Sequence, residues 1–555
     1  MYSSKRDIHA LVSLIRAHGV THVVACPGSR NAVIINDMNE CRFNLHPVTD
    51  ERSAGFVALG LALSTCSPVA VCVTSGSALL NLLPAVAEAY YRNIPILVIS
   101  ADRPARYIDT WDGQTIHQQD ALLPYAQTIS VNESVDEKNF KWNELKINKA
   151  LSCLSDRQQG PVHLNIEIEE PLFDFSTANI IPSTKVNTYY SHSIVPIPIE
   201  VMAQIASAKC PVVFIGQYER RTCSALETIE KNDALLVLPE ILTTSPHWHR
   251  TSILEQVVEN SGFHPDLIIH IGGNLVNKQL KNFFRKHDGI QVIRIEEKSL
   301  FPNTLSHLKS VIYANVEDTL RQLATLVRPN KEVKLWKEKL SFSTLDLNDI
   351  LTRDLFSDLY VMQQVAKRIQ LEWDIHLANS TTVRNATMIN DFRNHKIFAN
   401  RGTNGIEGSI STAVGYALGV KNKVIAMSGD LSFFYDANAL FNTEIPNNLS
   451  LIVFNNGGGQ IFRRLPGITD SQALDKFISA SHTYSAKGIA ESYGIKYFSL
   501  SQTDDLPNIL DEFLACNGQC PALLEVFTTI NNNEQARKVV ENVIKTNYNT
   551  RINGN

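Results

Sequence analysis

The sequence predicts an α/β protein of three doubly wound, mostly parallel-sheet domains, in which the first and third domains are related. Three observations support this fold class. Apolar runs rich in valine and isoleucine alternate with helical patterns along all 555 residues. Two polar stretches interrupt the alternation. The segments on either side of the middle part align with one another at a nearly constant offset.

The predicted strands are short, continuously apolar runs without polar alternation. Such runs are typical of parallel strands that are buried on both faces of a sheet. The clearest of them occur at residues 68–75, 94–100, 210–216, 265–273, 290–297, 423–429, 449–456 and 521–527.

The expected domain boundaries lie in the two polar stretches, at residues 176–198 and 328–349, which contain few strand-like runs. Single domains typically have about 100–200 residues, so a chain of this length agrees with three of them. The boundaries predict domains at residues 1–180, 190–330 and 350–555.

The first and third domains align as copies of one unit. The helical segment 51–63 aligns with 406–418, and four small or apolar residues fall on identical residues at an offset of 355. The glycine after the next predicted strand, Gly76, falls on Gly429 at an offset of 353. The strands that follow return to an offset of 355. Helix–sheet packing by itself favours small residues, but the near-constant offset favours a duplication.

The composition excludes several classes of protein. A formal net charge of -5 gives no broad attraction to nucleic acid or to an anionic membrane surface. No apolar run approaches the ~20 residues that span a bilayer, and the N-terminal pattern is an amphipathic helix instead of a signal peptide. Nine scattered cysteines without a CxxC pair predict reduced thiols. We therefore expect a cytoplasmic protein.

One turn carries an acid where phosphate-binding loops usually carry lysine or several glycines. In the stretch VIAMSGDLSFFYDANALFN, Asp430 follows Gly429 between a predicted strand and a helix. Asn455 and Asn456 end the next strand and precede three glycines. Both turns would lie at the carboxyl edge of one sheet, where a carboxylate, an amide oxygen and a glycine carbonyl suit Mg²⁺. In the simpler alternative, Asp430 caps the helix and the asparagines form a turn.

The Gly-Asp and Asn-Asn pairs at this spacing resemble the diphosphate–metal motif of thiamine diphosphate-dependent enzymes. Leu431 stands where that motif commonly has a second glycine. The resemblance implies that Asp430, Asn456 and the carbonyl of Gly458 bind Mg²⁺ or Mn²⁺. It also implies cofactor contacts from Glu51, Gly429, Asp430, Asn456, Gln460, Ile461 and Phe462.

The same resemblance implies a role for each domain. Residues 1–180 would be the pyrimidine-binding domain, 190–330 a central α/β domain and 350–555 the diphosphate-binding domain. In this family the two domains that enclose one cofactor come from different subunits. The resemblance therefore implies a homodimer or a dimer of dimers, with active sites at the subunit interface.

Glu51, in the string DERSAGF, precedes the small-residue helix of the first repeat. Enzymes of this family hold a glutamate against the aminopyrimidine ring of the cofactor. Such a carboxylate favours the imino tautomer, so that cofactor and protein together remove the weakly acidic proton at thiamine C2. The alternative is a surface glutamate that complements a helix dipole.

Longer strings resemble one branch of the family: CPGSRNA at 26–32, NSTTVR at 379–384 and NRGTNGIEGSIST at 400–412. Enzymes of this branch decarboxylate 2-oxoglutarate and add the succinyl carbanion equivalent to isochorismate, a conjugate addition in menaquinone biosynthesis. Both substrates are dicarboxylates, which arginines bind with bidentate geometry. The implied substrate-binding residues are Ser29, Arg30, Arg103, Gln114, Lys278, Ser380, Arg384, Arg401, Phe462 and Leu465.

Glu51, Arg384 and Arg401 are the residues expected to act directly in catalysis. Ile461 would bend the cofactor, beside an apolar wall, although plain core packing is the alternative for such side chains. Gly113 departs from the branch, which often has asparagine before the glutamine.

Two other interpretations stay open at this point. The chain could be another thiamine enzyme, such as an acetolactate synthase or a 2-oxo acid decarboxylase. However, it lacks the His-His pair of those decarboxylases, and its arginines exceed what pyruvate needs. A non-catalytic nucleotide- or CoA-binding protein would leave Glu51 and the Asp430–Asn456 pair unexplained.

Overall fold

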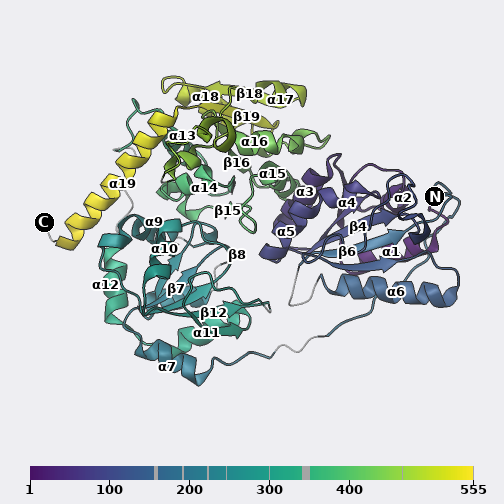
Figure 1. Cartoon of the computed structure of the whole chain (residues 1–555), viewed down its shortest axis with the longest axis horizontal. Coiled ribbons are helices and arrows are strands. Elements are labelled where there is room, and N and C mark those ends of the chain that lie inside the picture. The colour runs from purple at the N-terminus through teal and green to yellow at the C-terminus, as the bar shows by residue number, and fades with distance from the viewer. Residues whose placement is uncertain are drawn as a thin grey trace.

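In its described residues the computed structural model contains three large parallel sheets, each covered by helices on both faces, which confirms the predicted fold class (Figure 1). A two-stranded parallel sheet of β8 (Tyr218–Arg221) and β10 (Thr243–Thr244) accompanies them. The parts of the chain that it describes are residues 1–154, 160–189, 193–221, 224–245, 247–298, 300–340, 350–465 and 467–553. Parts of both expected boundary stretches, 190–192 and 341–349, lie outside the described residues.

The first sheet has six strands in the order β2-β1-β3-β4-β6-β5. Their bounds are β1 (His22–Ala25), β2 (Asn44–Pro47), β3 (Val69–Val73), β4 (Ile96–Asp102), β5 (Gln127–Val131) and β6 (Val162–Glu167). One face packs against α1 (Arg6–Ala17), α2 (Ala32–Glu40) and α6 (Glu137–Ser152). The other packs against α3 (Glu51–Thr65), α4 (Ser77–Asn81) and α5 (Leu83–Arg92).

The third sheet repeats this topology, with the order β15-β14-β16-β17-β19-β18. Its strands are β14 (Asp374–Leu377), β15 (Ile397–Phe398), β16 (Val424–Gly429), β17 (Leu449–Asn455), β18 (Lys496–Leu500) and β19 (Ala522–Phe527). Taken in chain order, each strand occupies the same place in the sheet as its counterpart in the first domain. This agreement confirms that the two domains are related.

The middle sheet has five strands in the order β13-β12-β11-β7-β9. They are β7 (Pro211–Ile215), β9 (Leu236–Pro239), β11 (Leu267–Ile271), β12 (Gln291–Glu296) and β13 (Leu308–Tyr313). One face packs against α7 (Ile199–Ser207), α8 (Ser224–Lys231) and α11 (Val316–Leu326). On the other face, α9 (Trp248–Val257), α10 (Lys278–Lys286) and α12 (Lys331–Lys339) share a core with the third domain.

The third domain is therefore packed between the other two. The C-terminal helix α19 (Ile530–Asn553) leaves the third sheet and extends along the middle domain beside α9 and α12 (Figure 1). On the opposite side, α15 (Ser409–Gly419) packs directly against α3 of the first domain.

The contact between α3 and α15 is reciprocal, as expected for related helices that face one another. A Cβ added at Gly60 would lie 2.1 Å from the carbonyl oxygen of Thr412. A Cβ added at Gly415 would lie 2.0 Å from the carbonyl oxygen of Val57. Val57 and Gly60 correspond to Thr412 and Gly415 at the repeat offset of 355. The small residues of the repeat thus bring two helix backbones together, where a side chain would not fit.

All eight predicted runs are strands in the structure. No comparable apolar run marks the four-residue strands β1 and β14, which nevertheless lie inside their sheets. In the described parts of the chain no helix is long and apolar enough to cross a bilayer, and all eight described cysteines are free thiols.

Candidate active site

Asp430 lies at the carboxyl edge of the third sheet, where β16 ends and α16 (Asp430–Tyr435) begins. Its side chain is only 3 % exposed. Oδ1 accepts a hydrogen bond from the backbone N–H of Leu431 (2.6 Å). Oδ2 accepts hydrogen bonds from the N–H groups of Gly458 (2.9 Å) and Asn456 (3.2 Å). Burial raises the pKa of Asp430, whereas these donors and the nearby His482 lower it.

Asn456 follows the adjacent strand β17, so parallel pairing places it beside Asp430, as the sequence spacing predicts. Its Oδ1 is buried and has no hydrogen-bond partner. Its Nδ2 donates to Oδ2 of Asp358 over 3.4 Å. Gly457 and Gly458 have positive φ values of 80° and 141°, which glycine adopts without strain. A carboxylate, an unpartnered amide oxygen and a glycine-rich loop therefore meet at one sheet edge.

Two further side chains support this group, and the sequence analysis identified neither of them. Asp358, in the first turn of α13 (Asp358–Ala366), is buried and accepts a hydrogen bond from Thr528 Oγ1 (2.6 Å). Burial raises the pKa of Asp358 to about 6. His482 Nδ1 accepts the N–H of Tyr484, and its Nε2 lies 3.4 Å from Asp430 Oδ2 without a hydrogen bond between them. Asp358 lies 98 residues from Asn456 in the sequence, so no spacing pattern indicates this contact.

These oxygens fit a hard divalent cation. No group of three His, Cys, Asp or Glu side chains that could hold a metal occurs within the described residues. A cation here would therefore depend on amide and carbonyl oxygens beside one carboxylate, a donor set that suits Mg²⁺. The buried, unpartnered Oδ1 of Asn456 is the observation that supports this fit, because a buried acceptor without a partner costs free energy.

The segment after the glycines forms a short 3₁₀ turn, η6 (Gln460–Arg464). Gln460 is buried and its Nε2 has no partner, while its Oε1 accepts a hydrogen bond from Asn533. Phe462 and Leu465 are 37 % and 42 % exposed, and Ile461 is half-buried. None of these three apolar side chains is buried in a hydrophobic core of this chain. Their surfaces are free to contact a ligand or another subunit.

Glu51 begins α3 and is half-buried. Its Oε2 accepts a hydrogen bond from Asn81 Nδ2 (3.1 Å). It borders a cavity of about 460 Å³ between the first and third domains, lined by Thr49, Asp50, Glu51, Arg52, Asn81, Asn438 and Phe441. Asp430, Asn456 and Gly458 do not line this cavity, so Glu51 and the third-domain motif do not share it.

The predicted residues of the first domain gather near the carboxyl ends of its strands. Arg30 is 4 % exposed and donates to the carbonyl oxygen of Ile168 (2.6 Å). Arg103 pairs with Asp112 (3.0 Å). Burial and the charge of Arg103 lower the pKa of Arg30, whereas Glu170, 3.4 Å from Arg30 Nη2, raises it.

Ser29 lies next to Arg30 in the turn after β1. Gln114 is exposed, in a loop that comes close to Gly76, the glycine after β3. The structure thus brings Ser29, Arg30, Arg103 and Gln114 to one end of the first domain.

The second predicted group lies between the third and middle domains. Arg401 is 5 % exposed; its Nη2 donates to the carbonyl oxygen of Leu275 (2.9 Å) and its Nη1 to Asn379 Oδ1 (3.3 Å). Burial and the neighbouring Arg384 lower the pKa of Arg401 to about 10. The Nη1 of Arg384 donates a hydrogen bond to the carbonyl oxygen of Ser380 (2.7 Å). Ser380 has a φ of 74°, a left-handed conformation at the end of β14.

The middle domain supplies further charges to this group at the start of α10. Lys278 is exposed at the first position of α10. Burial, Arg285 and Arg401 lower the pKa of Lys281, whereas Glu240 raises it. Glu240 is fully buried, accepts hydrogen bonds from the N–H groups of Val276 and Asn277, and has its pKa raised to about 7 by burial. The group thus combines the cations Arg384, Arg401 and Lys281 with the acids Glu240 and Glu255, whose charges raise the pKa of Arg384.

Comparison with known proteins assigns the family. The N-terminal TPP binding domain of thiamine pyrophosphate enzymes matches residues 8–122, and the C-terminal TPP binding domain matches residues 381–526. A 2-succinyl-5-enolpyruvyl-6-hydroxy-3-cyclohexene-1-carboxylate synthase from Phocaeicola vulgatus is 36% identical over 550 residues, which cover 95% of this chain and 96% of that protein. The chain belongs to this synthase family.

Other members of the synthase family show the same extent of similarity. The relative of the same name from Bacteroides thetaiotaomicron is 35% identical over 557 residues, covering 97% of this chain and 98% of that protein. Among solved structures, benzoylformate decarboxylase from Polynucleobacter necessarius has a TM-score of 0.74 at 18% identity, covering 96% of this chain and 99% of that chain. At this identity the structural likeness shows the fold alone.

The two matched domains explain the division of the predicted residues in this synthase-family chain. The first TPP binding domain contains Glu51, Arg30 and Arg103, and the second contains Arg401 and the Asp430–Asn456 pair. Thiamine diphosphate is therefore the cofactor, and each domain carries part of the residues expected around it.

Proposed function

We propose that the chain catalyses the thiamine diphosphate- and metal-dependent decarboxylation of 2-oxoglutarate and the conjugate addition of the remaining succinyl unit to isochorismate. The products would be CO₂ and 2-succinyl-5-enolpyruvyl-6-hydroxy-3-cyclohexene-1-carboxylate, as in menaquinone biosynthesis. The names of full-length relatives at 31–36% identity support this reaction. The observation within the chain that carries it is the pair of arginines between the third and middle domains, the buried Arg401 and the half-buried Arg384.

The cofactor site would be built from both TPP binding domains. Asp430, Asn456 Oδ1 and the carbonyl of Gly458 would hold Mg²⁺ or Mn²⁺, which in turn would bind the diphosphate. When bound, thiamine diphosphate supplies an electron sink for the bonding pair that decarboxylation releases. Phe462 and Leu465 expose apolar surface beside the glycine loop and would exclude water there.

Glu51 would act on the proton balance of the cofactor. Its carboxylate, hydrogen-bonded to the pyrimidine nitrogen, would favour the tautomer in which the exocyclic nitrogen accepts a proton. In this chain Asn81 donates to Oε2 and leaves Oε1 for such a bond. The cavity at Glu51 gives the carboxylate access to a small molecule.

Arg384 and Arg401 would bind substrate carboxylates. Arg401 is buried and Arg384 half-buried, and burial lowers the pKa of both, so a bound carboxylate would stabilise their charged forms beside Glu240, which already raises both pKa values. Arg30 and Arg103 form a similar pair in the first domain. Two arginine pairs on different domains suit two dicarboxylate substrates, because each pair would take one or more carboxylates.

We also propose that the active enzyme is a homodimer or a dimer of dimers. Glu51 opens onto a cavity that the Asp430 motif does not line, although both belong to TPP binding domains. A partner subunit would bring its own Asp430 motif to Glu51. Exposed apolar side chains near both regions, Leu80, Tyr435, Phe441 and Tyr484, provide surface for such an interface.

Donor choice tests the proposed reaction. The purified protein is assayed with isochorismate, thiamine diphosphate and Mg²⁺, and with either 2-oxoglutarate or pyruvate as donor. Two charge-assisted hydrogen bonds to the distal carboxylate, each worth ~1.5–3 kcal/mol, predict a preference for 2-oxoglutarate of roughly 10² to 10⁴ in kcat/KM. Arg384→Ala should reduce this preference and affect pyruvate little. Comparable kcat/KM values for both donors in the parent would favour an acetolactate synthase instead.

Subunit complementation tests the shared site. Glu51→Gln and Asp430→Asn subunits are each expected to be inactive. If one site uses Glu51 from one subunit and Asp430 from the other, a mixed dimer has one site with both substitutions and one with neither. Mixing the two variants after dissociation should therefore restore activity. No recovery in a confirmed mixed dimer would place both residues in one subunit's site.

A further inference from the structure

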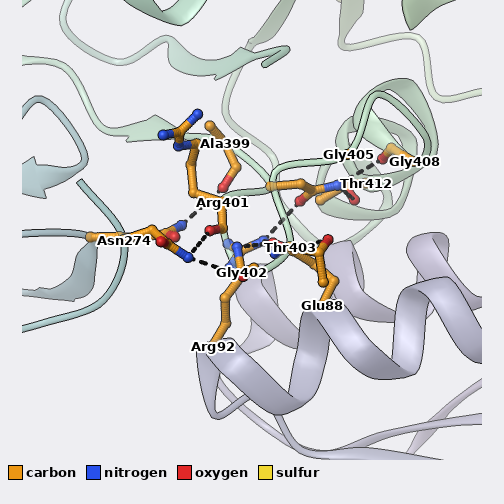
Figure 2. A network of polar contacts seen from close by, with 12 residues as sticks. Glu88, Arg92, Asn274, Ala399, Arg401, Gly402, Thr403, Gly405, Gly408 and Thr412 are labelled. Carbon is orange, nitrogen blue, oxygen red and sulfur yellow. Dashed lines mark hydrogen bonds and ion pairs between the residues drawn. The ribbon is translucent and has the colours of Figure 1, made fainter. Parts of the chain in front are cut away.

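Residues 400–403, which carry Arg401, lie where all three domains meet (Figure 2). From the middle domain, Asn274 Nδ2 donates to the carbonyl oxygens of Arg401 (2.5 Å) and Gly402 (3.0 Å). From the first domain, a carboxylate on α5 reaches the same peptides from the opposite side. That carboxylate belongs to Glu88, which was not among the predicted site residues.

Glu88 is fully buried and accepts three hydrogen bonds from this loop. Oε1 accepts the N–H of Gly402 (2.8 Å), and Oε2 accepts the N–H (2.7 Å) and Oγ1–H (2.9 Å) of Thr403. Arg92, one turn later on α5, lies 3.4 Å from Oε1 and donates to Asn400 Oδ1 (2.8 Å). The buried negative charge is thus balanced by a cation and by three hydrogen-bond donors, as a buried carboxylate requires.

The fit between Glu88 and the loop is close. A Cβ at Gly402 would lie 2.8 Å from the backbone carbonyl oxygen of Glu88 and 2.9 Å from its Oε2. Glycine at this position therefore lets the loop approach α5. Because Gly402 directly follows Arg401, the position of these peptides determines the position of the Arg401 Cα, from which its side chain extends.

We propose that Glu88 is a positioning residue for Arg401. It fixes the 401–403 peptides from the first domain, and through them it sets the guanidinium that reaches Leu275 O and Asn379 Oδ1. Glu88 lies in the N-terminal TPP binding domain, whereas Arg401 lies in the C-terminal one. The inference rests on the proposed function, because it assumes that Arg401 binds a substrate carboxylate.

A double-mutant cycle tests this inference. Glu88→Gln keeps the size of the side chain. One carboxylate oxygen that accepted a backbone N–H is replaced by an amide N–H₂, so two donors face one another and that hydrogen bond is lost. In the parent background we expect the Kd and KM for 2-oxoglutarate to rise by about 10-fold or more. In the Arg401→Ala background the same change should have an effect of less than about 2-fold, because residues that act through one another are not additive.

Asp436 provides a matched control. It is also fully buried and also accepts two backbone N–H groups and one hydroxyl, from Ile410 (2.8 Å) and from Ser411 N (2.7 Å) and Oγ (2.8 Å). Asp436→Asn removes the same charge away from the 401–403 loop. Its effects on 2-oxoglutarate binding and on thermal unfolding should be the same with and without Arg401.

Binding of 2-oxoglutarate by calorimetry is measured beside turnover, so that the two proposals fail differently. If the parent binds 2-oxoglutarate but does not consume isochorismate, the proposed reaction is wrong, and the cycle can still be completed by binding. Equal losses from Glu88→Gln in both backgrounds, or coupling as strong for Asp436→Asn, would overturn the positioning role. A parent that binds no 2-oxoglutarate would overturn both proposals.

Discussion

The contact between α3 and α15 leads to a quantitative prediction about Gly415→Ala. A Cβ at this position would lie 2.0 Å from Val57 O and 2.7 Å from Val57 Cα. Because both are backbone atoms, no side-chain rotation can relieve the clash. The two helices would have to separate by about 1.4 Å to restore an ordinary contact of 3.4 Å. That movement would loosen the core that joins the first and third domains.

The expected cost follows from two opposing effects. Overpacking a well-packed core typically costs 1–3 kcal/mol, and occasionally more when the backbone must shift. Alanine in a helix interior regains roughly 0.5–1 kcal/mol relative to glycine. We therefore expect a net loss of about 1 kcal/mol, which corresponds to a decrease of about 2–4 °C in the Tm of a unit of roughly 150–250 residues.

The assay is thermal unfolding followed by circular dichroism, with Gly488→Ala as the matched control. Gly488 lies in α17 (Lys487–Ser492), is exposed, and would have no heavy atom within 4 Å of an added Cβ. Its replacement should leave the Tm unchanged or raise it slightly. If Gly415→Ala is as stable as the parent, or gains as much as Gly488→Ala, the close approach of the two helices is not a constraint.

Three further predictions concern single carboxyl groups. Asp430→Asn should abolish the increase in Tm that thiamine diphosphate with Mg²⁺ produces in the parent, whereas an unchanged increase would exclude a role in cation binding. Glu51→Gln should keep that increase but slow exchange of the thiamine C2 proton by at least about 100-fold, followed by proton NMR in D₂O; near-parental exchange would contradict its role. Burial raises the pKa of Glu240 to about 7 from an ordinary value of 4.5, so the native state binds this proton more tightly than the unfolded chain and loses stability as the pH rises from about 4.5 to 7. Glu240→Gln should remove that part of the pH dependence, at most about 3 kcal/mol, and equal slopes of Tm against pH in both proteins would refute it.

The sequence by itself determined the fold class and the main motif. Long valine- and isoleucine-rich runs identify buried parallel strands because every side chain of such a strand faces a helix layer. The Asp430–Asn456 pair could be predicted from the sequence because adjacent parallel strands end at the same edge of a sheet. Residues one strand–helix–strand unit apart in the sequence therefore lie close together in space. The strands β1 and β14 could not be predicted from the sequence, because a run of four residues such as DIHL is too short to show an apolar pattern.

Only the tertiary structure decided how the domains cooperate. Glu88 and Asp358 are ordinary acids in the sequence, and their partners lie 314 and 98 residues away. No local periodicity encodes such contacts, because they depend on how whole domains pack. In the same packing Glu51 opens onto a cavity that the Asp430 motif does not line, whereas Arg401 reaches the middle domain. The sequence thus determined which chemical groups the protein carries, and domain packing determined which of them meet within one chain.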